Sequence, residues 1–247
     1  MLLGRVHAHA EFLGEVSEFG LATLGVWLGS LASAQGDLRG ARKIKERVLD
    51  VRRRVLGEEH PDTLISINNL AQTIKSQGDL PGARKLQEQV LDVHRRVLGE
   101  EHPNTLTSMQ NLAATLWSQG DLPGARKIQQ QVLEIHRRAL GEEHPATLTS
   151  MQNLAETLRS QGHLPGARKI AEQVLDVRRR VLGEEHPATV LSAWNLFRTL
   201  SDLKDEEAAE QVFTAHLVPL LQRDPATLSA DLRWIQSRLQ DLSEPRP

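Results

Sequence analysis

Apolar and polar positions follow the spacing of amphipathic helices along most of the chain. Between residues 61 and 102, one apolar stripe contains Leu64, Ile67, Leu70, Ala71 and Ile74. A second stripe in the same window contains Leu80, Ala83, Leu86, Val90, Val93 and Val97. Steps of three and four residues place each set on one face of a helix. No stretch has the period of two of a strand, so the sequence predicts an all-α fold.

Glycine and proline divide this window into two helices. Pro61 suits a first helical turn, because its missing N–H would have no partner there. Gly78 suits the residue that follows a helix, since glycine adopts the left-handed conformation at little cost. Asp79 is then a candidate N-cap for the second helix, which ends near Gly99. The window predicts helix A, a tight turn, helix B and another tight turn, with antiparallel neighbours.

The same window recurs with a fixed period. The tetrad Glu-Glu-His-Pro begins at Glu58, Glu100, Glu142 and Glu184, a step of 42 residues. Residues 103–144 and 145–186 differ at ten of 42 positions and align without a gap. Such a period is typical of a solenoid, in which each unit buries its apolar face against its neighbours. Alanine recurs where helices must approach closely, at Ala71, Ala113 and Ala155 in helix A and at Ala41, Ala83, Ala125, Ala167 and Ala209 in helix B.

The period also divides the chain into parts. We expect an N-terminal half-repeat helix at 1–18, a drifted first repeat at 19–60, regular repeats at 61–102, 103–144 and 145–186, a degenerate fifth repeat at 187–223, a capping helix at 224–243 and a tail at 244–247. An array that starts with half a repeat leaves an apolar helix face uncovered, which favours a cap or a contact with a partner. In the last helix one apolar stripe contains Leu228, Leu232, Ile235, Leu239 and Leu242, with Gln236 among the polar positions. One apolar and one polar face is what a terminal cap requires.

Composition and the absence of known motifs argue against several classes of function. The net charge of −2 creates no global field for nucleic acid or acidic membranes. The absence of cysteine excludes disulfides, thiol catalysis and thiolate metal sites. No phosphate loop, zinc-protease motif or nucleophile elbow occurs, so we expect no enzyme and no cofactor. No secretory signal or long apolar run is found, which predicts a cytoplasmic protein.

Two recurring polar features have structural explanations. His60, His102, His144 and His186 would lie about 10 Å apart in stacked repeats, whereas zinc ligands lie about 2 Å from the ion. We therefore interpret them as turn residues and expect no metal. The basic triplets that start at Arg52, His94, His136 and Arg178 end helix B, where cations are favourable near the helix dipole. We expect these triplets to form a solvated face rather than a phosphate-binding ridge.

The motifs together resemble a known family. Asn69-Leu70-Ala71, Gln77-Gly78-Asp79-Leu80, Ala83 and Leu98-Gly99-Glu100-Glu101-His102-Pro103-Asn104-Thr105 are similar to the 42-residue tetratricopeptide repeat (TPR) of kinesin light chains and their bacterial relatives. The resemblance covers about residues 19–213, and HEAT-type repeats lack this combination. It implies a right-handed α-α superhelical solenoid of about five TPR units with a C-terminal capping helix. The excess of arginine over lysine favours a bacterial source.

The resemblance also implies a site, because helix A of such repeats lines a concave groove that binds peptides. The corresponding residues are Asn68, Asn69, Gln72 and Lys75, then Gln110, Asn111 and Trp117, then Gln152, Asn153 and Arg159, and finally Trp194, Asn195 and Arg198. In peptide-binding relatives the asparagine before Leu-Ala binds the ligand backbone, a role that falls on Asn69, Asn111, Asn153 and Asn195. An amide suits it, since it both donates and accepts.

The other site residues would select side chains. Trp117 and Trp194 would be apolar anchors if they are exposed, and Lys75, Arg159 and Arg198 would favour acidic residues in the ligand. The alternative is that the asparagines bond only local backbone or solvent and that the tryptophans fill gaps between repeats.

The expected function is therefore non-enzymatic protein–protein interaction, with a partner segment that contains acidic and apolar residues. By family analogy the chain could be an adaptor or a regulatory subunit of a signalling or effector complex. We expect no nucleic acid and no membrane as partner. The alternative is a self-assembling structural scaffold that uses the array ends as interfaces.

Overall fold

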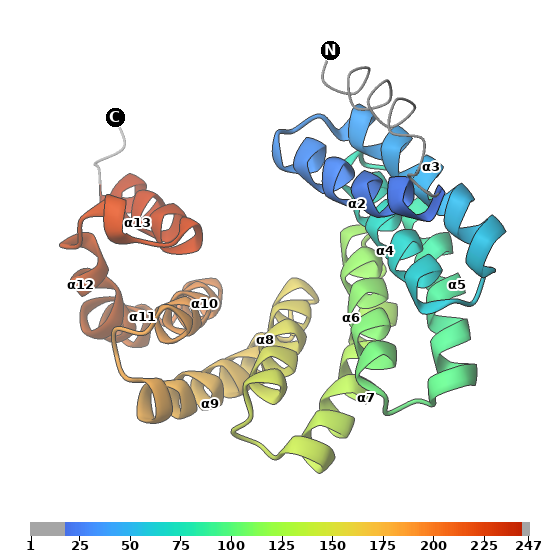
Figure 1. The fold of residues 1–247 in the computed structure, drawn as a ribbon. Helices are drawn as coiled ribbons and strands as arrows, with labels where there is room; N and C mark the ends of the chain where they lie inside the picture. The colour runs from blue at the N-terminus through green and yellow to red at the C-terminus, as the bar shows by residue number, and fades with distance from the viewer. Residues whose placement is uncertain (1–17, 244–247) are drawn as a thin grey trace. The chain divides into compact units, whose positions relative to one another are not determined.

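The computed structural model describes residues 18–243, and every regular element in that range is helical (Figure 1). The chain forms two compact units, residues 1–121 and 122–247. Unit 1 contains α2 (Glu18–Ala34), α3 (Leu38–Leu56), α4 (Pro61–Ser76), α5 (Leu80–Leu98) and α6 (Pro103–Ser118). Unit 2 contains α7 (Leu122–Leu140), α8 (Pro145–Ser160), α9 (Leu164–Leu182), α10 (Pro187–Leu203), α11 (Glu206–Val212), the π-helical η1 (Phe213–Leu217), α12 (Val218–Leu221), the 3₁₀ turn η2 (Pro225–Thr227) and α13 (Ala230–Ser243).

Consecutive helices pack against each other within each unit, as expected of a TPR-type solenoid. In unit 1, α3 lies between α2 and α4, and α5 lies between α4 and α6. The predicted apolar stripes form the core: Ile67, Ala83 and Val90 have no exposed surface. The half-repeat expected over residues 1–18 lies outside the described residues except for Glu18, which begins α2, and the tail at 244–247 lies outside them too.

The turn from helix A to helix B is set by a glycine and an aspartate. Gly78 follows α4 with φ +88°, and the N–H of Asp79 donates to the carbonyl of Ile74 at 3.1 Å, a bond that ends the helix. The side chain of Asp79 then caps α5 by accepting from the N–H of Gly82 at 2.9 Å. The predicted N-cap is therefore confirmed.

The fourth repeat lacks this cap. His163 stands at the position of Asp79, before α9, and makes no side-chain cap bond. We expect His163→Asp to raise the free energy of unfolding by about 1 kcal/mol, because the carboxylate would satisfy an orphan N–H at the start of α9. Urea unfolding measures the change. His163→Ala is the control and should leave the stability within about 0.5 kcal/mol, while an aspartate that stabilises no more than alanine would contradict the interpretation.

Helix B of the fifth repeat is irregular and is divided into α11, η1 and α12. Pro219 has no N–H to donate, and its ring would clash with the carbonyl four residues earlier in a regular helix. The N–H of Val218 instead donates to the carbonyl of Phe213, five residues back. This π-helical turn accommodates the proline within the packed helix.

The terminal helix begins later than expected. Asp224 caps only the turn η2, by accepting from the N–H of Ala226 at 2.9 Å. Leu228 is extended and buried, and α13 starts at Ala230 rather than at residue 224. Ser229 competes with Asp224 as a helix start, because its hydroxyl lies 3.4 Å from the N–H of Leu232.

Four residues of the predicted stripe, Leu228, Leu232, Ile235 and Leu239, are buried in the core of unit 2. Gln236 was expected on the polar face, but it is only 3% exposed. Its Nε2 donates to the carbonyls of Leu220 and Arg223 at 2.9 and 2.8 Å. Both bonds satisfy the buried amide at the C-terminal end of α12, which is why a polar residue can be buried here.

Candidate functional site

The Glu-Glu-His-Pro turn fixes where each helix A begins. Nδ1 of His60 accepts from the N–H of Asp62 at 3.1 Å, and the other three tetrad histidines repeat this cap. The first glutamate of the tetrad forms an ion pair with an arginine near the end of the helix B that precedes it, as Glu58 does with Arg53 at 3.0 Å. The second pairs with the next helix B, as Glu59 does with Arg96. The histidines are therefore turn residues, as the sequence indicated.

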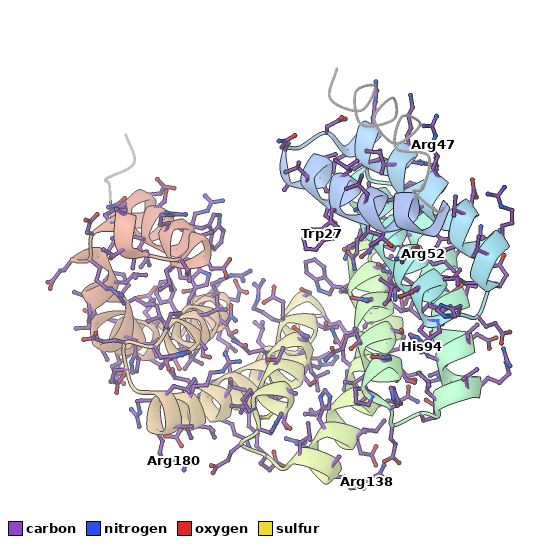
Figure 2. All side chains as sticks on the ribbon, viewed as in Figure 1. Trp27, Arg47, Arg52, His94, Arg138 and Arg180 are labelled. Carbon is purple, nitrogen blue, oxygen red and sulfur yellow. The ribbon has the colours of Figure 1, made fainter. Side chains whose placement is uncertain are left out.

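A buried polar clasp joins helix B to the following helix A. Nη1 of Arg52 donates to Ser66 Oγ at 2.9 Å and to the Asp62 carbonyl at 2.7 Å. In the next repeat, Nδ1 of His94 lies 2.8 Å from Ser108 Oγ. Arg52 and His94 lie inside unit 1 (Figure 2). Unit 2 repeats both forms, with His136 against Ser150 and Arg178 against Ser192.

These clasps correct the expectation of a solvated basic face. The first residue of each triplet is only 6–8% exposed: Arg52, His94, His136 and Arg178. Only the later residues of the triplets face solvent or pair with the tetrad glutamates. The signal was present in the sequence, because a serine follows each of these four positions by 14 residues. The clasp holds helix A in place beside the preceding helix B.

The histidine clasps predict a loss of stability in mild acid. Burial, together with the nearby histidines His102 and His144, lowers the pKa of His94 and His136 below the ordinary 6.5. The unfolded chain therefore takes up these protons at a higher pH than the folded chain. Stability is full above about pH 6.5 and falls as the pH drops through that value towards the folded pKa. Urea unfolding between pH 8 and 5 measures this slope.

His94→Arg with His136→Arg provides the comparison, because arginine occupies the same position in Arg52 and Arg178. We expect the doubly substituted chain to fold with a smaller slope between pH 7 and 5. An unchanged slope would show that other groups cause the acid sensitivity.

In unit 1 we group the polar-side positions of helix A as the unit 1 face, in which hydrogen bonds from Gln72 and Lys75 join α4 to α6. It consists of Trp27 on α2, Asn69, Gln72 and Lys75 on α4, and Asn111 and Trp117 on α6. Trp27, Asn69 and Asn111 occupy equivalent repeat positions, 42 residues apart. Trp27 is 73% exposed and Trp117 is 40% exposed. Figure 2 shows Trp27 projecting from α2. Sequence reasoning missed Trp27, although the 42-residue register places it at the asparagine position.

The amides of the unit 1 face are open to a ligand. Gln72 Nε2 lies 3.4 Å from Asn111 Oδ1, a long contact between exposed groups. Asn69 is half-buried beside them, whereas Oδ1 of Asn68 is buried without a hydrogen-bond partner. Asn68 therefore lies at the packed edge, and Gln110 is likewise half-buried. Asn69, Gln72 and Asn111 are the residues that can donate and accept at the surface.

Lys75 supplies the positive charge of the unit 1 face. Its Nζ donates to the Ala114 carbonyl at 3.2 Å, and within residues 18–243 it forms no ion pair with a carboxylate. Burial lowers the pKa of Lys75. A half-buried ammonium next to amides and indoles favours a carboxylate from a bound partner.

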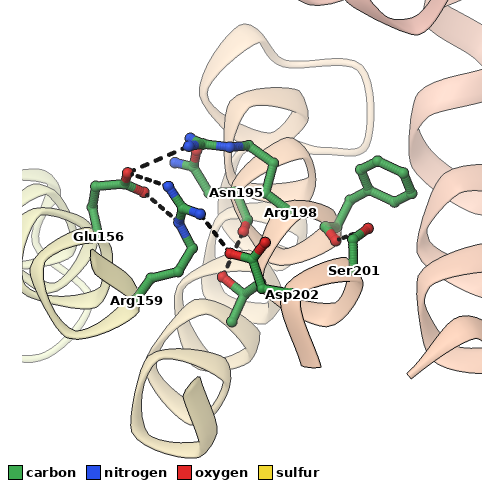
Figure 3. Close-up of polar contacts among 8 residues, drawn as sticks. Glu156, Arg159, Asn195, Arg198, Ser201 and Asp202 are labelled. Atoms are coloured by element: carbon green, nitrogen blue, oxygen red, sulfur yellow. Dashed lines mark hydrogen bonds and ion pairs between the residues drawn. The ribbon is translucent and has the colours of Figure 1, made fainter. Parts of the chain in front are cut away.

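In unit 2 the corresponding charges neutralise each other (Figure 3). Arg159 pairs with Glu156 on its own helix at 2.7 Å and with Asp202 of α10 at 2.5 Å. Arg198 also reaches Glu156, at 3.4 Å. Burial would raise the pKa of Glu156, but hydrogen bonds and charge from both arginines outweigh it and lower the pKa. The expectation that Arg159 and Arg198 select acidic ligands is therefore wrong in this structure, because two carboxylates already balance them.

Trp194 is also corrected by the structure. It is 6% exposed, its ring stacks on Phe197 with centroids 5.8 Å apart, and Trp234 meets it edge-on at 5.9 Å. Trp194 fills the gap between α10 and α13, as the alternative interpretation of the tryptophans held, and cannot be an exposed anchor. Trp234 is 52% exposed on α13, with Arg238 over its ring at 5.7 Å.

The remaining unit 2 site residues differ in exposure: Gln152 and Asn195 are half-buried and Asn153 is exposed. Gln152 Nε2 lies 3.4 Å from Ser192 Oγ, and Asn195 is half-buried. Both line a small pocket between α8, α9 and α10, together with Glu156. Asn153 is exposed. Unit 2 thus presents the exposed amide of Asn153 beside a balanced ion network, and the tryptophan at its helix A position, Trp194, is buried.

No cluster of three or more His, Cys, Asp or Glu residues suited to a metal ion is found in the described part of the chain. Within the same range, no helix is long and apolar enough to cross a membrane. The faces of helix A thus offer hydrogen bonds, apolar contact and charge.

A family model described as tetratricopeptide repeat matches residues 21–79, 67–126 and 110–180. The chain is a tetratricopeptide repeat protein. Its repeats are of the kinesin-light-chain-like type and form a module for protein–protein interaction. A search of curated proteins gives no significant match.

Solved TPR structures are similar over most of the chain. A putative kinesin light chain of Podosopora anserina with nearly identical TPR-like repeats is 26% identical, with a TM-score of 0.71 over 90% of this chain and 98% of that one. BtubC (BKLC) from P. vanneervenii is 20% identical, with a TM-score of 0.70 over 99% and 91%. A Rap protein complexed with Competence and Sporulation Factor is 11% identical, with a TM-score of 0.63 over 83% and 55%. The last two likenesses concern the fold alone.

Proposed function

We propose that this TPR protein binds an extended peptide segment of a partner protein on the unit 1 face. The observation that carries the proposal is the combination of two exposed tryptophans, Trp27 and Trp117, with open amides between them. Solvent-exposed indoles are costly and are typical of binding hot spots. The amides can pair with the donors and acceptors of an extended backbone.

The positive charge of Lys75 favours a ligand with an acidic residue. Lys75 lies between the two tryptophans in repeat order and has no carboxylate partner among the residues that the structure describes. We infer that the ligand has apolar side chains for the two indoles and an acidic residue for Lys75. The corresponding position in unit 2, Arg159, is already paired with Glu156 and Asp202, so we place recognition in unit 1.

The family and the fold agree with such a role. TPR repeats form interaction modules, and a Rap protein of similar fold has been solved in complex with Competence and Sporulation Factor. A chain of this kind would serve as an adaptor or regulatory subunit that brings a partner to a signalling or effector complex.

The test is selection from a random peptide library displayed on phage, with the full chain as bait. Counter-selection uses the Asn69→Ala, Asn111→Ala double variant, after circular dichroism shows that its helicity is unchanged. We expect enriched peptides with spaced apolar residues and at least one acid, which bind the wild-type chain and not the variant. Enrichment of peptides that bind both equally would overturn the proposed site.

A further inference from the structure

The outer surface of helix B carries opposite charges in the first and the last repeat. Three positions, one helical turn apart, are occupied by Arg39, Lys43 and Arg47 in the first repeat. The three middle repeats all have proline, lysine and glutamine there: Pro81, Lys85 and Gln89; Pro123, Lys127 and Gln131; Pro165, Lys169 and Gln173. The last repeat has Glu207, Gln211 and Ala215. Only the two end repeats depart from the shared pattern, and they do so in opposite directions.

Arg39, Lys43 and Arg47 form what we call the basic stripe of α3. All three are exposed, and Arg47 extends outward from α3 (Figure 2). None of them forms an ion pair within the part of the chain that the structure describes. Like charges four residues apart repel, so the stripe does not stabilise its own helix. Its charge is available to a partner.

The carboxylates that could neutralise the basic stripe are few. Eight residues of α3 are Arg or Lys and two are Glu or Asp, which leaves six positive charges net. Of the two acids, Glu46 already pairs with Arg42 at 2.8 Å. Asp50 is the other, and it forms no ion pair with the basic stripe among the described residues. The stripe therefore keeps a net positive charge at the surface.

The last repeat has the opposite surface. Glu206, Glu207 and Glu210 form what we call the acidic stripe of α11, a helix with no basic residue. All three are exposed, and Glu207 and Glu210 line a shallow hollow of unit 2 with Gln211, Thr214 and Ala215. The positive groups near this helix are Lys204, which precedes it, and Arg168, which is held by Glu172 and Asp205 at 2.7 Å. Acidic residues in the first turn of a helix interact favourably with the helix dipole, which explains Glu206 and Glu207. Glu210 lies beyond the first turn and is not explained in this way.

We propose that the basic stripe of one copy binds the acidic stripe of a second copy, so that chains associate head to tail. The occupant follows from charge: the outer surface of helix B is basic in the first repeat and acidic in the last, with Glu207 at the repeat position of Arg39. Such a contact is heterologous, so a pair of bound copies leaves one basic and one acidic stripe free for further copies. Exposed ion pairs are weak and screened by salt, so the association is weak and favoured at low ionic strength. It uses helix B and leaves the unit 1 face free for its peptide.

The test is sedimentation velocity on the full chain with charge-reversed variants. The first, Arg39→Glu with Arg47→Glu, makes both stripes acidic; the second, Glu207→Lys with Glu210→Lys, makes both basic. We expect the average mass of the sedimenting wild-type species to rise with protein concentration at about 20 mM salt. At about 500 mM salt it should equal the mass of the monomer. Each variant alone should associate at least about tenfold more weakly, and an equimolar mixture of the two should recover wild-type strength to within about tenfold.

Lys85→Glu with Lys127→Glu is the matched control, since it changes the net charge as much as the first variant does, in the middle repeats. It should associate like the wild type. A wild-type chain that stays monomeric at low salt, or a mixture of variants that fails to recover association, would overturn the proposal; the latter result would assign the basic stripe to a different acidic partner. Peptide binding at the unit 1 face, measured on the same variants, should be unchanged, so this proposal and the proposed function can fail separately.

Discussion

Arg178→Ala should lower the free energy of unfolding of unit 2 by about 2–3 kcal/mol. The side chain is 7% exposed, and its Nη1 donates to Ser192 Oγ and to the Ala188 carbonyl at 2.9 and 3.1 Å. Hydrogen bonds from a charged donor contribute about 1.5–3 kcal/mol, and the buried stem adds packing. Because repeat arrays are held by nearest-neighbour interfaces, the loss should also uncouple α9 from α10 and broaden the transition. Urea unfolding followed by circular dichroism measures both effects.

Neighbouring and conservative substitutions separate the clasp from a general effect of charge. Arg179→Ala removes an exposed arginine that pairs with Asp176 at 3.3 Å, and it should change stability by no more than about 0.5 kcal/mol. Arg178→His copies the clasp of His136 and should retain more than half of the stability that alanine loses. If Arg178→Ala lowers the free energy of unfolding no more than Arg179→Ala does, the clasp does not hold the repeats together.

Trp117→Ala should weaken binding of a library-selected peptide by about 30-fold or more. The indole is 40% exposed on α6, so its removal leaves the core of unit 1 intact. Aromatic hot spots commonly contribute 2 kcal/mol or more, and each 1.4 kcal/mol is a factor of ten in affinity. Isothermal titration calorimetry with the selected peptide gives the dissociation constant of each chain.

Trp234→Ala is the matched control for this substitution. Trp234 is likewise partly exposed, at 52%, but it lies on α13 of unit 2, beside Trp194, and is not part of the unit 1 face. Its replacement should leave peptide affinity within about twofold of wild type. Equal losses for the two variants would show that the indoles act through overall stability and not through contact with the peptide.

The fold could be predicted closely because the same sequence pattern recurs in several repeats. Each copy pairs an apolar stripe with a proline start and a glycine end, and the positions Gly78 and Asp79 behave as their chemistry requires. The fifth repeat was harder, since Pro219 forces a π-helical turn and Ser229 competes with Asp224 to start α13. Local competition of this kind is decided by packing, as when the extended Leu228 enters the core.

The site was predicted less well, because side-chain partners come from other repeats. The 42-residue spacing predicted the positions of Asn69 and Asn111 in helix A. It did not predict that Glu156 and Asp202 would neutralise the charge of Arg159. Trp194 was placed at the surface by its register, yet α13 covers it. Trp27 was overlooked because it breaks the Asn-Leu-Ala motif. Charge balance and burial depend on neighbours that lie about 40 residues away, which local patterns do not encode.

The most direct test of the account is to locate the bound peptide on the chain by photo-crosslinking. A library-selected peptide would carry a benzophenone at its centre, and mass spectrometry would identify the attached residues. The account predicts crosslinks on α4 and α6 around Gln72, Lys75 and Ala114, with loss of crosslinking after Trp117→Ala. Crosslinks on the helix B surfaces α3 and α5, unaffected by Trp117→Ala, would contradict recognition by the unit 1 face.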